Sequence, residues 1–183
     1  MRNAAEDQRF VEPGYLFGLL FILMIPGLAC AGDLTVYTGF QNPGKLTVDN
    51  VTRDTELGSV VGARISAGRV IGFEQTFAYS PKFLESSRHA FNTQSNLLVG
   101  VPIGHLSPYG TAGIGLIATG SSSFFDFRDI GTKFTINYGG GITLRNLAGP
   151  VGVRFDVRGY SVPGVFDQTL NFIEGTVGIV LSW

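Results

Sequence analysis

The chain has 183 residues, only 15% of them charged, and a formal net charge of −1. No run of basic residues is present, which argues against a nucleic-acid partner. The single cysteine excludes an internal disulfide bond, and two histidines far apart in the sequence offer no metal-binding motif. We therefore expect no cofactor, and the length suits a single domain.

The N-terminal residues have the pattern of an export signal. Residues 15–28 form an uncharged apolar run, which is shorter than the roughly 20 residues of a transmembrane helix. Ala29-Cys30-Ala31 follows as a small-x-small cleavage site, so we predict a signal peptide at residues 1–31 and a mature domain at residues 32–183. The acidic residues before the run depart from the usual pattern, and a translation start downstream would explain them. An uncleaved anchor and acylation of Cys30 are alternatives, but Leu28 stands one place away from the lipoprotein pattern.

After the predicted cleavage site, apolar side chains recur at every second residue in one segment after another. Neighbouring side chains of a strand point to opposite faces, so this alternation predicts β-strands. Most segments have one almost wholly apolar face, opposite a face of glycine, polar and charged residues. The eight predicted strands are residues 34–41, 57–66, 69–79, 91–103, 109–119, 133–145, 151–158 and 171–183.

The links between these strands alternate in length. The long links are residues 42–56, 80–90, 120–132 and 161–168, and the short ones are residues 67–68, 104–108 and 146–150. Short periplasmic turns, longer external loops and an even number of antiparallel strands are typical of bacterial outer-membrane barrels. The sequence therefore predicts an all-β fold, an eight-stranded antiparallel up-and-down transmembrane β-barrel with both termini in the periplasm.

Charged side chains of the predicted strands lie opposite the apolar faces. A lipid-facing lysine or arginine costs about 2–4 kcal/mol at the bilayer midplane, so the charged face must line the lumen. Buried charges need partners, and we expect the acidic and basic side chains to pair there. The candidate network comprises Arg64, Glu74, Arg154, Asp156, Arg158 and Glu174. Glu174 would pair with an arginine on the adjacent first or seventh strand, whereas Lys133, Arg145 and Arg158 could instead stand in water at strand ends.

The last predicted strand is apolar on one face up to the terminal residue. A terminal tryptophan suits a membrane interface, where its ring is well placed. The strand also resembles the C-terminal assembly signal of outer-membrane barrels. The matching residues are Thr176, Gly178, Leu181 and Trp183. This resemblance implies recognition by the barrel-assembly machinery.

Three further runs, Thr38-Gly39-Phe40, Tyr109–Gly115 and Tyr138–Gly141, extend the resemblance. Residues 32–183 resemble the small outer-membrane β-barrel family that includes the barrel of outer-membrane protein A. The resemblance implies a monomer in the outer membrane of a Gram-negative cell envelope, with lipopolysaccharide around its external rim. It does not imply one activity, because members are anchors, adhesins or defence factors. A porin-like function is possible only for small solutes, because side chains fill the lumen of an eight-stranded barrel.

Two histidines are the candidate catalytic bases of this sequence. His105-Leu106-Ser107 has the His-x-Ser spacing of the lipid A deacylase type, but it lies in a predicted periplasmic turn with no acidic residue nearby in the sequence. His89 follows Glu85, Ser86 and Ser87 in a predicted external loop, where a solvated cluster is the simpler explanation. Without a nucleophile, base and orienting group, we predict no enzymatic activity.

The leading prediction is thus a structural or surface-interaction barrel. A soluble periplasmic or secreted barrel that binds a small apolar ligand is one alternative, and a lipid A-modifying barrel enzyme is another. Aromatic residues of the predicted external loops would either bind lipopolysaccharide or a partner, or belong to the aromatic girdle at the outer interface. They are Phe83, Phe124, Phe125, Phe127 and Phe166.

Overall fold

The computed structural model describes residues 32–43, 46–48, 51–53, 57–81, 89–120, 132–165 and 168–183. These residues form ten strands: β1 (Gly32–Pro43), β2 (Leu46–Val48), β3 (Val51–Arg53), β4 (Gly58–Ala67), β5 (Ile71–Ser80), β6 (His89–Gly100), β7 (Leu106–Gly120), β8 (Thr132–Ala148), β9 (Val151–Val165) and β10 (Gln168–Ser182). Within the described ranges no helix is long and apolar enough to cross a membrane.

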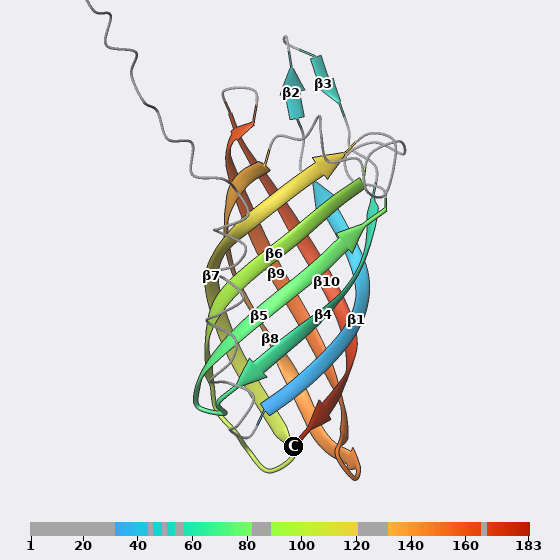
Figure 1. The fold of residues 1–183 in the computed structure, drawn as a ribbon, viewed down its shortest axis with the longest axis vertical. Helices are drawn as coiled ribbons and strands as arrows, with labels where there is room; N and C mark the ends of the chain where they lie inside the picture. Colours follow the sequence, from blue (N-terminus) through green and yellow to red (C-terminus); the bar gives the residue numbers. More distant parts are fainter. Residues whose placement is uncertain are drawn as a thin grey trace, which may run out of the picture.

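Eight of the strands close into one antiparallel barrel, in the order β1-β10-β9-β8-β7-β6-β5-β4 (Figure 1). The first and last strands close it: β1 pairs with β10 on one side and with β4 on the other. Closure extends to the end of the chain, where the Gly32 and Trp183 backbones exchange hydrogen bonds of 3.2 and 3.0 Å. The predicted eight-stranded all-β barrel is confirmed, and none of its strands has a free edge.

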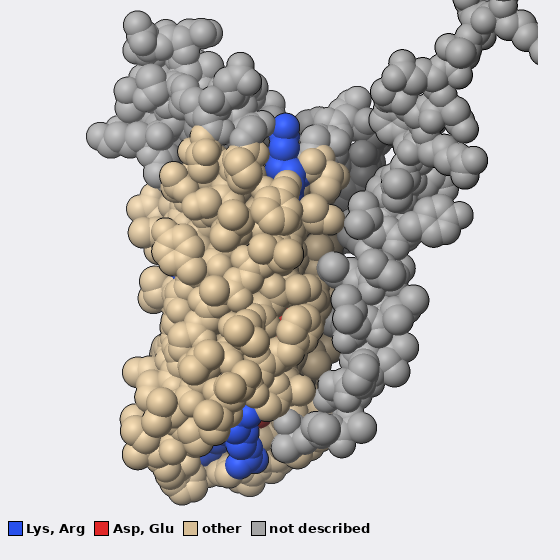
Figure 2. Space-filling view, turned by 90° about the vertical axis from the view of Figure 1, so that its left-hand side faces the viewer, with Lys and Arg blue, Asp and Glu red and all other residues tan. Residues whose placement is uncertain are grey.

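The two faces of the barrel wall are inverted relative to those of a soluble barrel. Large apolar side chains stand outward and exposed on every barrel strand, from Val36 on β1 to Ile179 on β10. The largest fully buried side chains include arginine, glutamate, glutamine and asparagine. In Figure 2 the lysine and arginine side chains that are plainly visible lie near the two ends of the barrel. The alternation in the sequence therefore predicts correctly which face is apolar.

The structure corrects several of the predicted links. β7 begins at Leu106 and β8 ends at Ala148, so most of the predicted link 104–108 and part of the predicted link 146–150 belong to strands. β9 continues to Val165 and β10 begins at Gln168, so most of the predicted link 161–168 belongs to strands. The reason is apolar burial, since Tyr160, Val162 and Phe172 pack inside this end of the barrel. The predicted link 42–56 contains the short β2–β3 hairpin, which the sequence analysis missed.

The hairpin marks one end of the barrel. Figure 1 shows the start of β1 and the C-terminus at the opposite end, where the turns are short. Gly68 and Gly149 supply the left-handed backbone of two of these turns, with φ of 91° and 62°. We call the two ends the hairpin end and the terminal end.

Candidate functional site

All six charged residues of the predicted network lie inside the barrel. Arg64 is on β4, Glu74 on β5 and Glu174 on β10, while β9 supplies the other three at every second position, residues 154, 156 and 158. Strand alternation sends all six inward, and each is 3% exposed or less. Three positive and three negative charges thus share one buried space.

Asp156 is the centre of the network. Its Oδ2 accepts hydrogen bonds from Arg64 Nη1 and Arg154 Nε, both at 2.9 Å, and its Oδ1 accepts one from Arg158 Nη2 at 2.9 Å. Charge-assisted bonds of this length are the strong class of hydrogen bond. Three arginines on one carboxylate leave an excess of positive charge, which the two glutamates balance.

Glu74 connects opposite walls of the barrel. Its carboxylate lies 2.7 Å from both Arg154 Nη1 and Arg158 Nη2. In the strand order, β5 and β9 are four strands apart in either direction, so they face each other across the lumen. These ion pairs therefore span the barrel and close its centre.

Glu174 does not pair as predicted. Its ion pair is with Arg64 of β4, at 3.4 Å, and Gln41 Nε2 donates to it at 2.8 Å. Arg158 is its directly paired neighbour on β9, but the Arg158 side chain extends across the lumen to Glu74. The prediction that Glu174 pairs with an arginine on an adjacent strand is therefore wrong. In a closed barrel the long arginine side chains reach carboxylates on strands that are not their neighbours.

The three residues for which water at a strand end was the alternative prediction, Lys133, Arg145 and Arg158, differ in their positions. Arg158 is fully buried, so for this residue that alternative is wrong. Lys133 is exposed at the hairpin end. Arg145 lies at the terminal end, where its Nη2 is 2.5 Å from Asp33 Oδ2; Asp33 also accepts a 2.6 Å hydrogen bond from Ser182. Asp33 was not among the predicted residues.

Two inward tyrosines support the arginines, and the sequence analysis did not identify them. The Arg64 guanidinium lies 3.8 Å from the Tyr37 ring centroid, and that of Arg154 lies 4.4 Å from the Tyr109 ring centroid. Arg154 Nε also donates to the Tyr109 hydroxyl at 2.7 Å. The alternation of the sequence could have identified both tyrosines, because each occupies one of the positions of its strand that point into the lumen.

Glycines on neighbouring strands make room for these rings. A Cβ atom added at Gly62 would stand 2.6 Å from the Tyr37 ring, and one added at Gly141 would stand 2.5 Å from the Tyr109 hydroxyl. Glycine at these two positions thus allows an inward aromatic side chain to approach the neighbouring strand closely.

Uncharged side chains fill the space beside the network. Asn137 Nδ2 donates to Gln94 Oε1 at 2.8 Å and to Asn96 Oδ1 at 2.7 Å, linking β8 to β6. Towards the hairpin end, the Tyr160 and Phe172 rings stack with centroids 4.7 Å apart in an apolar cluster. The described lumen is therefore occupied by side chains, with charge in its middle.

The two histidines do not form a catalytic arrangement with the described residues. His105 is exposed in a turn, and its Nδ1 lies 3.1 Å from the Arg145 carbonyl oxygen, while Ser107 is buried on β7. His89 begins β6, with its ring centroid 6.2 Å from that of Tyr79. No cluster of three or more histidine, cysteine, aspartate or glutamate residues suited to a metal occurs in these ranges.

Several predicted features lie outside the described residues. They are the signal peptide at residues 1–31 with Cys30, residues 85–87 before His89, and the loop aromatics Phe83, Phe124, Phe125, Phe127 and Phe166.

Solved structures show which proteins share this architecture. Neisserial surface protein A (NspA) matches with a TM-score of 0.65 at 9% identity, over 83% of this chain and 97% of that one. The N-terminal β-barrel domain of Pseudomonas aeruginosa OprF matches with a TM-score of 0.54 at 11% identity, over 84% and 97%. The outer membrane enzyme PagL matches with a TM-score of 0.50 at 13% identity, over 81% and 98%.

The fold is that of the small eight-stranded outer-membrane β-barrels. It agrees with the resemblance to the barrel of outer-membrane protein A. No family model matches the sequence, and no curated protein matches it. At such low identities the likeness extends to the fold alone, and the neighbours include both a surface protein and an enzyme.

The buried network yields a stability prediction. Glu74→Gln keeps the side-chain shape but removes the charge opposite Arg154 and Arg158, so the free energy of unfolding should fall by about 3–5 kcal/mol, as when a buried pair loses one partner. Urea unfolding of the barrel in lipid vesicles measures this change. Lys133→Ala is the control, because Lys133 is exposed. Equal unfolding midpoints for Glu74→Gln and the parent protein would contradict the prediction.

The glycine–tyrosine packing yields a second prediction. Gly62→Ala places a methyl group against both the Phe77 carbonyl oxygen and the Tyr37 ring. It should destabilise the barrel by about 1–3 kcal/mol, as overpacking does elsewhere. Gly110→Ala is the matched control, since a Cβ atom there meets only the Gly139 carbonyl oxygen, at 3.9 Å. The same unfolding assay distinguishes the two variants, and equal losses of stability would argue against a packing requirement for glycine at position 62.

Proposed function

We propose that this chain spans a bacterial outer membrane as a structural or surface-interaction barrel without enzymatic activity. The inversion of its faces is the observation that supports this function best. Exposed apolar side chains encircle the wall, including Val36, Val61, Ile71, Leu97 and Ile114 on successive sides. Contiguous apolar surface of this extent is rare on soluble monomers and matches a hydrocarbon surrounding.

The alternative of a soluble barrel with a small apolar ligand has little support from the lumen. Such a barrel would need an apolar interior cavity, whereas the centre of this lumen contains six paired charges. A wide pore is disfavoured for the same reason, because Glu74 and the arginines of β9 meet across the barrel axis.

The enzyme alternative rests on fold likeness. PagL is an enzyme, but the likeness to it concerns only the fold. In the described part of the chain, neither histidine has a hydrogen bond to a carboxylate that would orient it as a base. We therefore favour a binding or structural role over lipid A modification.

The proposed orientation follows from the two ends. Long connections and the β2–β3 hairpin lie at one end and would face outside, with lipopolysaccharide around that rim; both termini would face the periplasm. The C-terminal assembly signal would be recognised by the barrel-assembly machinery. Of its residues, Leu181 and Trp183 stand outward, whereas Thr176 and Gly178 face the lumen. We propose that the finished barrel is a monomer.

Heat-modifiable migration tests the proposed location. The folded barrel, extracted from an outer-membrane fraction without boiling, should migrate differently on a semi-native gel from the boiled sample, because a closed β-barrel resists the detergent until heated. Recovery of the chain from the soluble periplasm, with no shift, would refute the proposal.

A lipid-facing charge provides the matched variants. Ile114, exposed at mid-length on β7, should not tolerate arginine: Ile114→Arg costs about 2–4 kcal/mol at the midplane and reduces the heat-modifiable fraction. Leu57 is just as apolar and exposed but precedes β4 at the hairpin end, so Leu57→Arg should cost about 0–1 kcal/mol. Equal losses of stability and equal heat-modifiable fractions for the two variants would argue against a bilayer around the barrel.

A further inference from the structure

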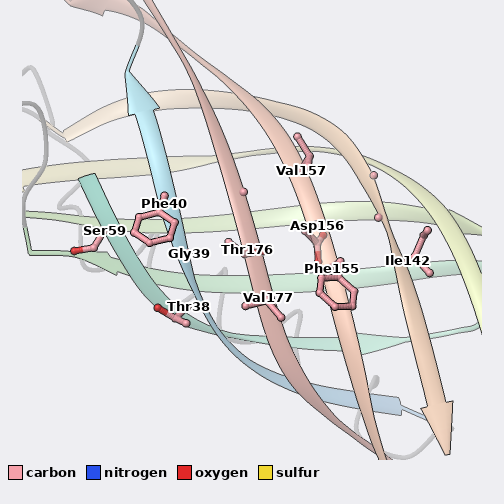
Figure 3. A pocket seen from close by; sticks show the side chains of 13 residues that line it. Thr38, Gly39, Phe40, Ser59, Ile142, Phe155, Asp156, Val157, Thr176 and Val177 are labelled. Atoms are coloured by element: carbon pink, nitrogen blue, oxygen red, sulfur yellow. The ribbon is translucent and has the colours of Figure 1, made fainter. Parts of the chain in front are cut away.

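A hollow of about 560 Å³ opens on the outer face of the wall, where β1, β10, β9 and β8 lie side by side. Figure 3 shows the Phe40 ring on one side and the Phe155 ring on the other, with β10 passing between them. Val157, Val177 and Ile142 complete the lining around them. The volume lies within the range of roughly 300–1,000 Å³ of small-molecule sites.

Register explains why a hollow forms here. One row across the wall pairs Phe40 with Gly175, Gly175 with Val157, and Val157 with Gly140. Large side chains and glycines thus alternate along the row, and the glycines form the floor. A Cβ atom added at Gly175 would meet no atom within 4 Å, so the space above this glycine is open.

The lining offers almost no polar chemistry. The Thr38 hydroxyl donates to the Val60 carbonyl oxygen at 3.1 Å. Asp156 borders the hollow, but its carboxylate is held by arginines in the lumen. The Thr176 hydroxyl accepts hydrogen bonds from Arg64 inside the lumen, which leaves the Ser59 hydroxyl as the remaining polar side-chain group among the lining residues. A headgroup, a sugar or an ion would find no charged partner in this site.

We propose that the hollow binds one acyl chain of a membrane lipid. This inference rests on the proposed function, because the hollow faces hydrocarbon only when the barrel spans a bilayer. A chain lying on the convex wall touches protein on one side. A chain in the hollow touches the glycine floor and both aromatic walls, which adds dispersion contacts and holds it in place.

A lipid chain fits this shape better than a second copy of the barrel does. Two convex walls meet along a narrow line and leave the floor of the hollow uncovered, whereas a slender, flexible chain can lie along it. The floor consists of backbone at Gly175 and Gly140, so a narrow ligand can lie close to the strands there.

Photo-crosslinking in vesicles tests the site. The folded barrel is reconstituted with a phospholipid that has a diazirine in one acyl chain, irradiated, digested and mapped by mass spectrometry. Phe40 and Val157 of the hollow, 62% and 61% exposed, are compared with Val36 and Ile179 outside it, 61% and 60% exposed. We expect more adducts at the first pair, although all four are equally accessible. Equal labelling of both pairs would overturn the proposal.

Filling the hollow should abolish the difference between the pairs. Gly175→Leu places a side chain in the open space above the floor, and labelling of Phe40 and Val157 should fall to that of Val36 and Ile179. Ala112→Leu is the control, because Ala112 is also small, exposed and outward but does not line the hollow. If Gly175→Leu does not fold, Gly175→Ala, which meets no atom, should give a partial loss.

The controls separate this inference from the proposed function. Each variant is first checked for heat-modifiable migration after reconstitution, so failure to insert counts against the membrane location and not against the lipid site. A photoreactive residue placed at position 40 or 157 of the protein tests for a second copy: protein–protein adducts from it at low protein-to-lipid ratio would identify a second copy as the occupant and overturn the lipid assignment.

Discussion

The barrel depends on the neutralisation of six charges buried in its lumen. Each of these charges would be costly to bury alone, and together they tolerate burial because three carboxylates meet three guanidinium groups at hydrogen-bonding distance. Since Arg64, Glu74 and Glu174 come from β4, β5 and β10, the ion pairs between strands can form only after the sheet closes. Closure and charge pairing are therefore one requirement, which favours a single register among the many that an alternating sequence permits.

The remaining lumen follows from the space that the arginines need. The Arg64 and Arg154 side chains lie over Tyr37 and Tyr109, and the rings in turn require glycine opposite them. Inward glycine is thus a packing requirement of a narrow charged lumen. With the middle of the lumen filled by polar groups, most large apolar side chains stand on the outside. The apolar outer wall and the closed lumen therefore have the same cause.

The sequence alone predicts the parts of this structure that depend on alternation: eight strands, the apolar face, and the inward direction of the six charged side chains. Pairing could not be predicted, because Arg64 reaches Glu174 across an intervening strand. The extension of β9 and β10 was missed since Gly159, Ser161 and Asn171 stand outward there, and the contrast between faces disappears while the strands continue.

The hollow shows a further limit of the same kind. The alternation of side-chain direction along β10 already distinguishes Gly175, which faces outward, from Gly178, which faces Tyr37 in the lumen. This alternation does not predict which side chains of the neighbouring strands lie beside an outward glycine. That depends on the register of four strands, which places Phe40 on one side of Gly175 and Val157 on the other. A hollow with aromatic walls is therefore a property of the closed barrel, set by the same register that aligns the charges within.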